Sequence, residues 1–275
     1  MKRVMNIYPG TVGKALLGML PFVLTIIVYL WVSDTRLEIN PNDKLMPSFS
    51  KIGDAIERMA FEPSKRTGEY LLWVDTLASL QRLLLGVLAA ASLGLIVGLL
   101  NGTIPTVRAN LSPYVTALSL IPPMAILPIL FIIFGLGELS KVMLIVIGIT
   151  PFLMRDLQAR ALELPAEQLI KAQTLGASTW QVMVRVIIPQ ILPRLIEAVR
   201  LSLGPAWLFL IAAEAIAAEQ GLGYRIFLVR RYLSMDVILP YVVWITFLAF
   251  FTDWILRQIS HRAFPWFHSQ VGGKS

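Results

Sequence analysis

The sequence predicts an all-α integral membrane protein with six transmembrane helices. Hydrophobic residues make up 56% of the 275 positions and the mean hydropathy is +0.71, well above the composition of a soluble domain. Apolar stretches close to the roughly 20 residues that a helix needs to cross a bilayer recur along the chain. Cysteine is absent and only two histidines occur, which excludes a Cys/His zinc site or a histidine-based catalytic site inside the fold.

The net charge of +7 does not indicate a nucleic-acid-binding protein. Its basic residues are dispersed between apolar runs and form no single stripe that would follow phosphates. We therefore expect the basic residues to flank membrane spans, and we expect no nucleic acid as a partner.

The first transmembrane helix is expected at residues 15–33, after a cytoplasmic N-terminus of residues 1–14. A basic N-terminus before an apolar run is typical of a secretion signal, but no small-residue cleavage pattern follows before Asp34. We therefore interpret the run as a retained helix. Pro21 is tolerated because neighbouring helices can satisfy the freed carbonyl group.

Residues 34–75 are too polar to enter lipid and predict an external loop. Within it, apolar side chains recur at three- and four-residue spacing, at Phe49, Ile52, Ile56 and Met59. This pattern predicts a short amphipathic helix at the membrane surface. Two roles stay open and equal: a helix that packs on the spans, or a dock for an external partner.

Residues 76–258 predict a five-helix core, followed by a cytoplasmic C-terminal tail at 259–275. The expected spans are Leu83–Leu100, Ala109–Gly137, Val142–Met154, Leu201–Ala213 and Val237–Thr252. The two shortest are flanked by charged residues, which membrane helices tolerate when they face other helices or a wet cavity. Six spans place both termini on one side, and the basic loop residues weakly favour the cytoplasm.

For the glycines and for the prolines of the core, two roles are possible in each case. Gly94, Gly98 and Gly102 share one helix face, for which general helix packing is favoured over a specific dimer contact. Pro122 and Pro123 interrupt the amide ladder of the third span, together with Pro128. A packing kink and a lining of a translocation path account for these prolines equally well.

Three charged residues near the fifth span also call for an interpretation. Glu214 follows a 13-residue uncharged run, so it needs a partner or water at membrane depth. An ion pair at the membrane interface is favoured over a place on a translocation path. Glu197 and Arg200 stand three residues apart and are predicted to pair with each other.

The charged connection after the fourth span predicts two helices joined by a corner. Leu169, Ala172 and Leu175 share one helix face, Gly176 interrupts the pattern, and a second apolar pattern starts near Trp180. Glycine permits a bend that a residue with a side chain resists. A bent helical element that projects from the membrane suits the groove of another protein.

This element, residues 163–185, resembles the cytoplasmic EAA loop of the permeases of ABC importers. The family pattern is Glu-Ala-Ala, three residues, Gly, and about nine residues later Ile-x-Leu-Pro. Ala172, Gly176, Ala177 and the ending Ile187-Ile188-Pro189 match.

The first two positions of the family pattern are different in this chain. Ile170 stands where the family usually has Glu, and Lys171 where it has Ala. Glu167, one turn earlier, could replace the missing carboxylate.

The resemblance extends over residues 45–267 and narrows to the nitrate/sulfonate/taurine group of these permeases. It rests on the segments MPSFSKIGDAI, TLASLQRLLLG, IPPMAILPILFIIFGLGELSKV and AAEAIAAEQGLGYRIF. It implies a type I ABC importer permease with a MetI-like fold in the bacterial inner membrane, with both termini cytoplasmic. The chain would be no enzyme and would hold no cofactor or metal, because ATP binds to a partner subunit.

The implied partners are a cytoplasmic ATP-binding subunit, an external solute-binding protein and a second permease copy, which would form a homodimer. The residues expected to couple the loop to the ATPase are Glu167, Lys171, Ala172, Gly176, Ala177 and Thr179. The residues expected on the translocation path are Pro122, Pro123 and Glu214.

For the substrate, FLVRRYLSMDVILPY and GPAWLFLIAAEAIA resemble a subgroup associated with urea carboxylase and guanidine metabolism. This favours guanidinium or urea, with nitrate, taurine or another sulfonate as the alternative. Charge does not decide, because Glu214, Glu219 and Asp236 lie beside several arginines. An ATP-independent channel or secondary carrier is the alternative from a different class.

Overall fold

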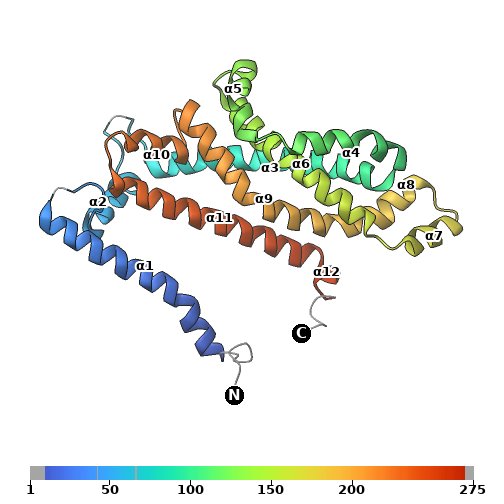
Figure 1. Ribbon diagram of the computed structural model, residues 1–275, viewed down its shortest axis with the longest axis horizontal. Coiled ribbons are helices and arrows are strands. Elements are labelled where there is room, and N and C mark those ends of the chain that lie inside the picture. The colour runs from blue at the N-terminus through green and yellow to red at the C-terminus, as the bar shows by residue number, and fades with distance from the viewer. Residues whose placement is uncertain (1–9, 42, 66, 270–275) are drawn as a thin grey trace.

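The computed structural model describes residues 10–41, 43–65 and 67–269, and these ranges contain helices and no strand (Figure 1). The expected N-terminal segment is therefore described only from Gly10, and residues 270–275 of the tail lie outside the described part. Five helices are long and apolar enough to cross a membrane: α1 (Thr11–Ile39), α3 (Leu71–Thr103), α6 (Glu138–Leu162), the helix that ends with α9 (Ile188–Ala217), and α11 (Met235–Ala263).

The helices α3 and α6 form the centre of the fold through a seam of small residues. Each seam glycine of α3 abuts an α6 side chain, in the pairs Gly86–Ile145, Gly94–Leu153, Gly98–Leu157 and Gly102–Ala161. The offset between partners is the same in every pair, so the two helices run parallel. A Cβ atom at any of these glycines would lie under 3.0 Å from α6. The prediction that the glycines serve helix packing is thus confirmed, and the packing is within the chain.

The interruption that Pro122 and Pro123 predict in the third span, expected at residues 109–137, is confirmed. The chain forms two helices there, α4 (Pro105–Ser119) and α5 (Pro123–Phe134), which meet at an angle of 96°. Pro122 is the N-cap of α5 and Pro123 its first residue. Two consecutive prolines favour the end of a helix because the helical region is disfavoured for the residue before a proline, and because proline donates no backbone hydrogen bond.

The bent pair α4–α5 still accounts for one crossing. Because α3 and α6 are parallel, the chain must return from the end of α3 at Thr103 to the start of α6 at Glu138. The described helices therefore give the six crossings that the sequence predicts, with the third one broken. Pro128, also expected to interrupt the span, lies inside α5 without breaking it.

The first helix, α1, diverges from the others (Figure 1), and among the described residues its hydrogen bonds to the following loop lie near its end. The hydroxyl of Tyr29 donates to the carbonyl of Pro47 at 2.7 Å, and the hydroxyl of Ser33 donates to the carbonyl of Met46 at 3.0 Å. None of its most apolar window is buried against the rest of the chain. This surface is suited to lipid.

The expected amphipathic helix is α2 (Phe49–Ala60), which begins at the N-cap Ser48. It packs on α3 and α11 through Ala55 and Ala60, which are buried. The first of the two alternatives, a loop helix that packs on the spans, is therefore observed. A docking role for its outer face stays a prediction.

Arg200 does not pair with Glu197, which is a second correction. Glu197 accepts a hydrogen bond from Arg194 at 3.1 Å, whereas Arg200 makes two bonds, at 2.8 and 3.0 Å, to Asp253 on α11. A guanidinium group can donate two parallel hydrogen bonds to one carboxylate. This paired geometry is stronger than the single bond that a neighbour on the same helix would accept.

Candidate functional site

The corner at Gly176 has a defined backbone structure. It follows α7 (Ala166–Thr174), and Gly176 has φ of +83°. Its amide donates to the carbonyl of Gln173 at 2.9 Å, and the amide of Ala177 donates to that of Ala172 at 3.0 Å. These two bonds are the Schellman motif, which needs a left-handed residue and therefore favours glycine. The predicted corner is confirmed.

A capping box that the sequence interpretation missed starts the next helix, α8 (Thr179–Val182). The amide of Gln181 donates to the hydroxyl of Ser178 at 3.3 Å, and the amide of Ser178 donates to the side chain of Gln181 at 2.8 Å. The signal was visible as serine followed three residues later by glutamine. One helix thus ends and the next begins within four residues, and local hydrogen bonds fix the bend between them.

The projecting end of the molecule exposes large apolar side chains. Figure 1 shows α7 and α8 at one end and α2 and α10 (Leu222–Arg230) at the other. Ile170, Leu175 and Trp180 are 57%, 87% and 71% exposed, while Leu169 and Ala172 pack on a buried cluster. Leu175 therefore does not share the inward face as expected, because it sits at the C-cap where the chain turns away. Such a patch at a tip indicates a surface for a partner protein.

The expected coupling residues all lie on this corner. Glu167, Lys171 and Thr179 are exposed on its surface, and so is Gly176. The two remaining ones, Ala172 and Ala177, are half-buried and pack on the cluster beneath. The structure thus gathers them on one bent element.

The corner is joined without interruption to a membrane span. Helix α8 continues through a wider π-helical turn, η2 (Met183–Ile187), into α9, and the three form one helix from Thr179 to Ala217. The amide of Ile188 donates to the carbonyl of Met183. The wide turn lies where Pro189 would otherwise clash with a carbonyl one turn earlier.

At the end of the molecule near α10, Glu214 of α9 is fully buried in a polar network. Its carboxylate accepts hydrogen bonds from Ser79 at 2.7 and 2.9 Å, from Arg82 at 2.7 Å and from the amide of Gly223 at 2.9 Å. Arg82 also donates to the carbonyl of Gln220 at 2.8 Å. A buried carboxylate is stable when its charge is paired and its oxygens are satisfied in this way.

A second buried carboxylate, Asp75 of α3, holds the adjoining helix α10 (Leu222–Arg230). It accepts bonds from the amide of Gly221 at 2.9 Å, from Arg225 at 2.8 Å and from the hydroxyl of Tyr241 at 3.1 Å. The connection from α9 to α10 is therefore fixed to α3 through its backbone amides.

A third set of charges lies on the surface of the same network. Glu138, the first residue of α6, binds both Arg82 and Lys141, with 2.9 Å to the former and 2.8 Å to the latter. The side chains of Arg82 and Lys141 are 7% and 3% exposed, whereas that of Glu138 is 64% exposed. Two buried cations are thus covered by one exposed carboxylate.

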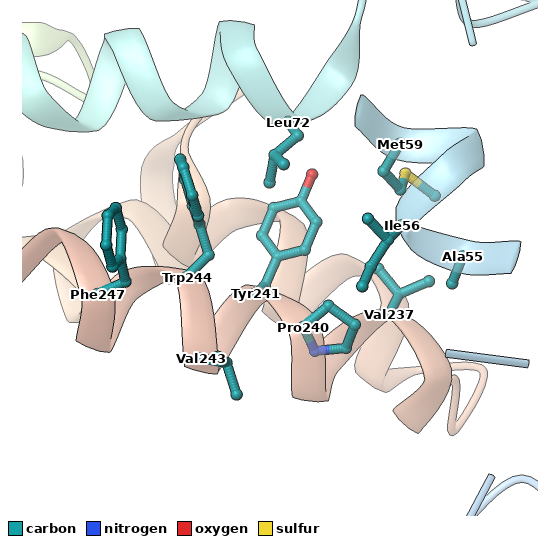
Figure 2. A pocket seen from close by; sticks show the side chains of 10 residues that line it. All are labelled: Ala55, Ile56, Met59, Leu72, Val237, Pro240, Tyr241, Val243, Trp244 and Phe247. Atoms are coloured by element: carbon teal, nitrogen blue, oxygen red, sulfur yellow. The ribbon is translucent and has the colours of Figure 1, made fainter. Parts of the chain in front are cut away.

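Three pockets differ in the chemistry that they offer. The pocket between α2 and α11 has a volume of about 360 Å³ and an apolar lining; the hydroxyl of Tyr241 points toward α3 (Figure 2). A second pocket, of about 570 Å³, lies at the bend of α4 and α5 and is lined by Pro123, Ser119 and Arg155. A third, of about 580 Å³, is lined by Arg82, Glu138, Lys141 and Glu219. Of these three, only the second and third offer charged groups to a polar solute.

Six crossings and a bent helical element at one end of the molecule define a multi-span helical membrane protein of the transport-permease type. The chain belongs to the family of binding-protein-dependent transport system inner membrane components, whose model matches residues 79–264. Its members are non-enzymatic permeases of ABC importers, so the ATP-independent channel or carrier is not supported. The expected multi-pass protein of the inner membrane is confirmed.

Relatives and a solved structure agree with this assignment. The chain is 38% identical to the taurine transport system permease protein TauC of Escherichia coli strain K12, over 73% of this chain and 72% of that one. It is 30% identical to the putative aliphatic sulfonates transport permease protein SsuC of Bacillus subtilis strain 168, over 70% of each chain. It is 28% identical to the nitrate import permease protein NrtB of Synechococcus elongatus, over 75% of each.

The inward-facing MetNI methionine ABC transporter contains a chain that matches with a TM-score of 0.63 at 21% identity, over 72% of this chain and 98% of that one. This match shows the fold. The expected MetI-like fold and the nitrate/sulfonate/taurine group are therefore confirmed.

Proposed function

We propose that the chain forms, with a second copy of itself, the membrane path for a small sulfonate such as taurine. A solute-binding protein delivers the sulfonate from outside, and a cytoplasmic ATPase drives its import. The observation that carries the proposal is the identity of 38% with a taurine permease, together with 30% for a permease of aliphatic sulfonates. Nitrate is a second oxyanion substrate in the same group.

This substrate replaces the guanidinium or urea that the sequence favoured. The relatives described above give no support to a guanidine or urea substrate. Of the three acidic residues that would attract a cation, two are neutralised, because Glu214 pairs with Arg82 and Asp236 pairs with Arg58 at 3.3 Å. The sulfonate alternative therefore fits better.

The corner around Gly176 is proposed as the contact with the ATPase. Lys171 and Thr179, with Glu167 one turn earlier, provide polar contacts on its surface, and Ala172 and Ala177 anchor it. The exposed apolar tip supports this role, because its side chains lose water-exposed area on docking. In this arrangement the end with α7 is cytoplasmic, and so are both termini.

The bend at Pro122 and Pro123 is proposed to line the path. Pro123 lines a pocket with two charged groups, Asp156 and Arg155, of which Arg155 donates to Ser119 at 2.9 Å. Irregular backbone at membrane depth is tolerated where it lines a cavity or meets protein. For Glu214, the buried contacts favour the ion-pair alternative, in which it anchors the path without facing it.

Reconstitution tests the transport activity. The permease, its ATPase and its solute-binding protein are placed in liposomes, and uptake of labelled taurine, nitrate and guanidinium is measured with and without ATP. We expect ATP-dependent uptake of taurine. Uptake of guanidinium alone, or taurine uptake at full rate without the ATPase, would contradict the proposal.

The role of the corner is tested at Gly176. Valine there is strained by roughly 1–2 kcal/mol because the left-handed conformation disfavours a branched side chain, so Gly176→Val should abolish the stimulation of the ATPase by loaded binding protein. Asparagine tolerates this conformation, so Gly176→Asn should retain most of the stimulation. Gly53→Val, at an open helical position on α2, is the control, and membrane insertion is monitored throughout.

Orientation is tested with single cysteines, since the chain has none. Gln173→Cys on α7 should resist a membrane-impermeant maleimide added to intact cells, whereas Glu69→Cys between α2 and α3 should react. The reverse pattern would refute the assignment of α7 to the cytoplasm.

A further inference from the structure

The charge layer formed by Arg82, Glu138 and Lys141 has an unusual distribution of exposure. Arg82 and Lys141 occupy the same seam between α3 and α6 as the glycines, one helical turn before Gly86 and Ile145. Both cations are buried, so each needs an anion at all times. Among the described residues, Glu138 is the anion that contacts both cations. Its own side chain is mostly exposed to solvent.

Lys141 has hydrogen-bonding capacity to spare. An ammonium group carries three N–H donors, and across the described ranges its one hydrogen bond goes to Glu138 at 2.8 Å. Arg82 is held from behind by Glu214 and the carbonyl of Gln220, and it presents its other edge to Glu138. A second acceptor that reached this position would therefore find donors from both cations.

The pocket of about 580 Å³ opens on this layer. Arg82, Glu138 and Lys141 line it, together with Glu219 and Gln220 from the connection after α9. It lies at the α10 end of the molecule, where the spans α6 and α9 meet their connecting loops. The size is within the usual range for small-molecule sites.

We propose that this pocket is a binding site for a zwitterionic aminosulfonate, of which taurine is the smallest common example. The sulfonate displaces the carboxylate of Glu138 from Lys141 and Arg82. The ammonium group of the same solute pairs with the released Glu138 and with Glu219. This inference rests on the proposed function and assigns it a substrate class and a site.

Charge balance favours a zwitterion over a simple anion. The pocket and the layer behind it hold two cations, Arg82 and Lys141, and three carboxylates, Glu138, Glu214 and Glu219. A simple anion would add to the excess of negative charge once Glu138 is displaced. A zwitterion adds no net charge and gives each displaced group a new partner, so the buried cations are never left without an anion.

Glu138 is suited to exchange because of its position. It is the first residue of α6, its side chain is largely exposed, and within the described part of the chain its side-chain bonds go to the two cations. Moving it into water uncovers the pocket without breaking any bond that Glu214 or Asp75 makes. The apolar pocket of Figure 2 offers no such charged groups.

The site is tested by direct binding to the permease–ATPase complex in lipid nanodiscs, with labelled taurine and with ethanesulfonate, which lacks the amine. We expect the wild type to bind ethanesulfonate at least about tenfold more weakly than taurine, since the pairs of the ammonium group with Glu138 and Glu219 are both lost. Glu219→Gln should weaken taurine binding about tenfold without weakening the binding of ethanesulfonate. Lys141→Gln should weaken both.

Glu138→Gln separates displacement from a purely structural role. If the carboxylate competes with the solute, its removal tightens the binding of ethanesulfonate several-fold; a structural role predicts weaker binding or misfolding. Lys65→Gln and Glu69→Gln, which change exposed charges on the loop between α2 and α3, are the matched controls and should bind as the wild type does.

The outcomes are distinguishable from those of the transport assay. If proteoliposomes import taurine while Glu219→Gln treats the two ligands as the wild type does, the site is refuted and the proposed function stands. If no sulfonate is imported, the proposed function fails. Equal binding of taurine and ethanesulfonate to the wild type also overturns the site.

Discussion

Replacing Gly94 by alanine would place a methyl group where α6 already lies. The new Cβ atom would be 2.7 Å from the Cβ of Leu153, which is fully buried. Carbon atoms attract each other best at about 3.5–4.0 Å, so the helices must separate by about 1 Å at this point. The neighbouring atom is at the base of its side chain, so rotation of Leu153 gives no relief.

The magnitude follows from two opposing terms. Alanine is favoured over glycine inside a helix by about 0.5–1 kcal/mol, whereas overpacking of a closely packed interior costs about 1–3 kcal/mol. The difference between the central values of the two terms predicts that Gly94→Ala destabilises the protein by about 1 kcal/mol. Gly18→Ala, on α1 with nothing within 4 Å of the added atom, should be neutral or slightly stabilising.

The assay is denaturation of the purified permease in mixed micelles, followed by tryptophan fluorescence. Gly94→Ala should lower the midpoint relative to Gly18→Ala, although the change of residue type is the same. A midpoint equal to or above that of Gly18→Ala would show that α3 and α6 do not approach as closely as described, and the parallel seam would be wrong.

Three further predictions concern other parts of the molecule. Trp180→Ala should reduce the affinity for the ATPase about tenfold, as expected for an exposed aromatic anchor, and change the denaturation midpoint little. Glu214→Gln should destabilise the protein by about 3 kcal/mol because it leaves a buried cation less well paired. Glu219→Gln, at an exposed position, should change stability by less than about 0.5 kcal/mol. Equal effects of the two substitutions on denaturation would contradict the burial of Glu214. The hydrogen bond from Arg36 lowers the pKa of Asp43 below its ordinary value, so the stabilisation that Asp43 provides should be present at neutral pH and lost as the pH falls through that lowered pKa. The difference in melting temperature between wild type and Asp43→Asn should accordingly shrink toward acid pH, and a difference that grows there would refute the pairing.

The spans were predictable because a bilayer imposes a simple requirement on composition. The run from Leu83 to Leu100 is apolar, and α3 contains it. The helix begins earlier, at Leu71, because Asp75 and Arg82 are satisfied by other helices. Hydropathy treats such residues as exposed to lipid, so it cannot count them as part of a span.

The break at Pro122 was predictable from the two prolines, but the angle between the two helices was not. Hydropathy describes composition and is blind to backbone geometry, so residues 109–137 satisfied the length rule although two consecutive prolines end the helix. The local corner at Gly176 was predictable because a glycine directly after a helical pattern is typical of a helix C-terminus. The capping box at Ser178 was equally local and could have been found.

The contacts between distant helices could not be predicted from one sequence. Glu197 and Arg200 are close along the chain, yet Arg200 binds Asp253 on another helix. In the same way, Glu138 and Lys141 acquire their significance only because the parallel seam brings Arg82 beside them. Three-residue spacing gives an opportunity to pair, and packing decides whether it is taken.

The helix from Thr179 to Ala217 connects the corner to the buried network around Glu214 without a loop between them. It has 39 residues, and it is bent (Figure 1), because a π-helical turn, Pro193 and Pro205 lie within it. Near its far end, the carboxylate of Glu214 is bonded to Ser79 and Arg82 at 2.7–2.9 Å. A displacement of that end must therefore carry α3 along or break these bonds, so the two ends of the molecule are linked through one continuous helix.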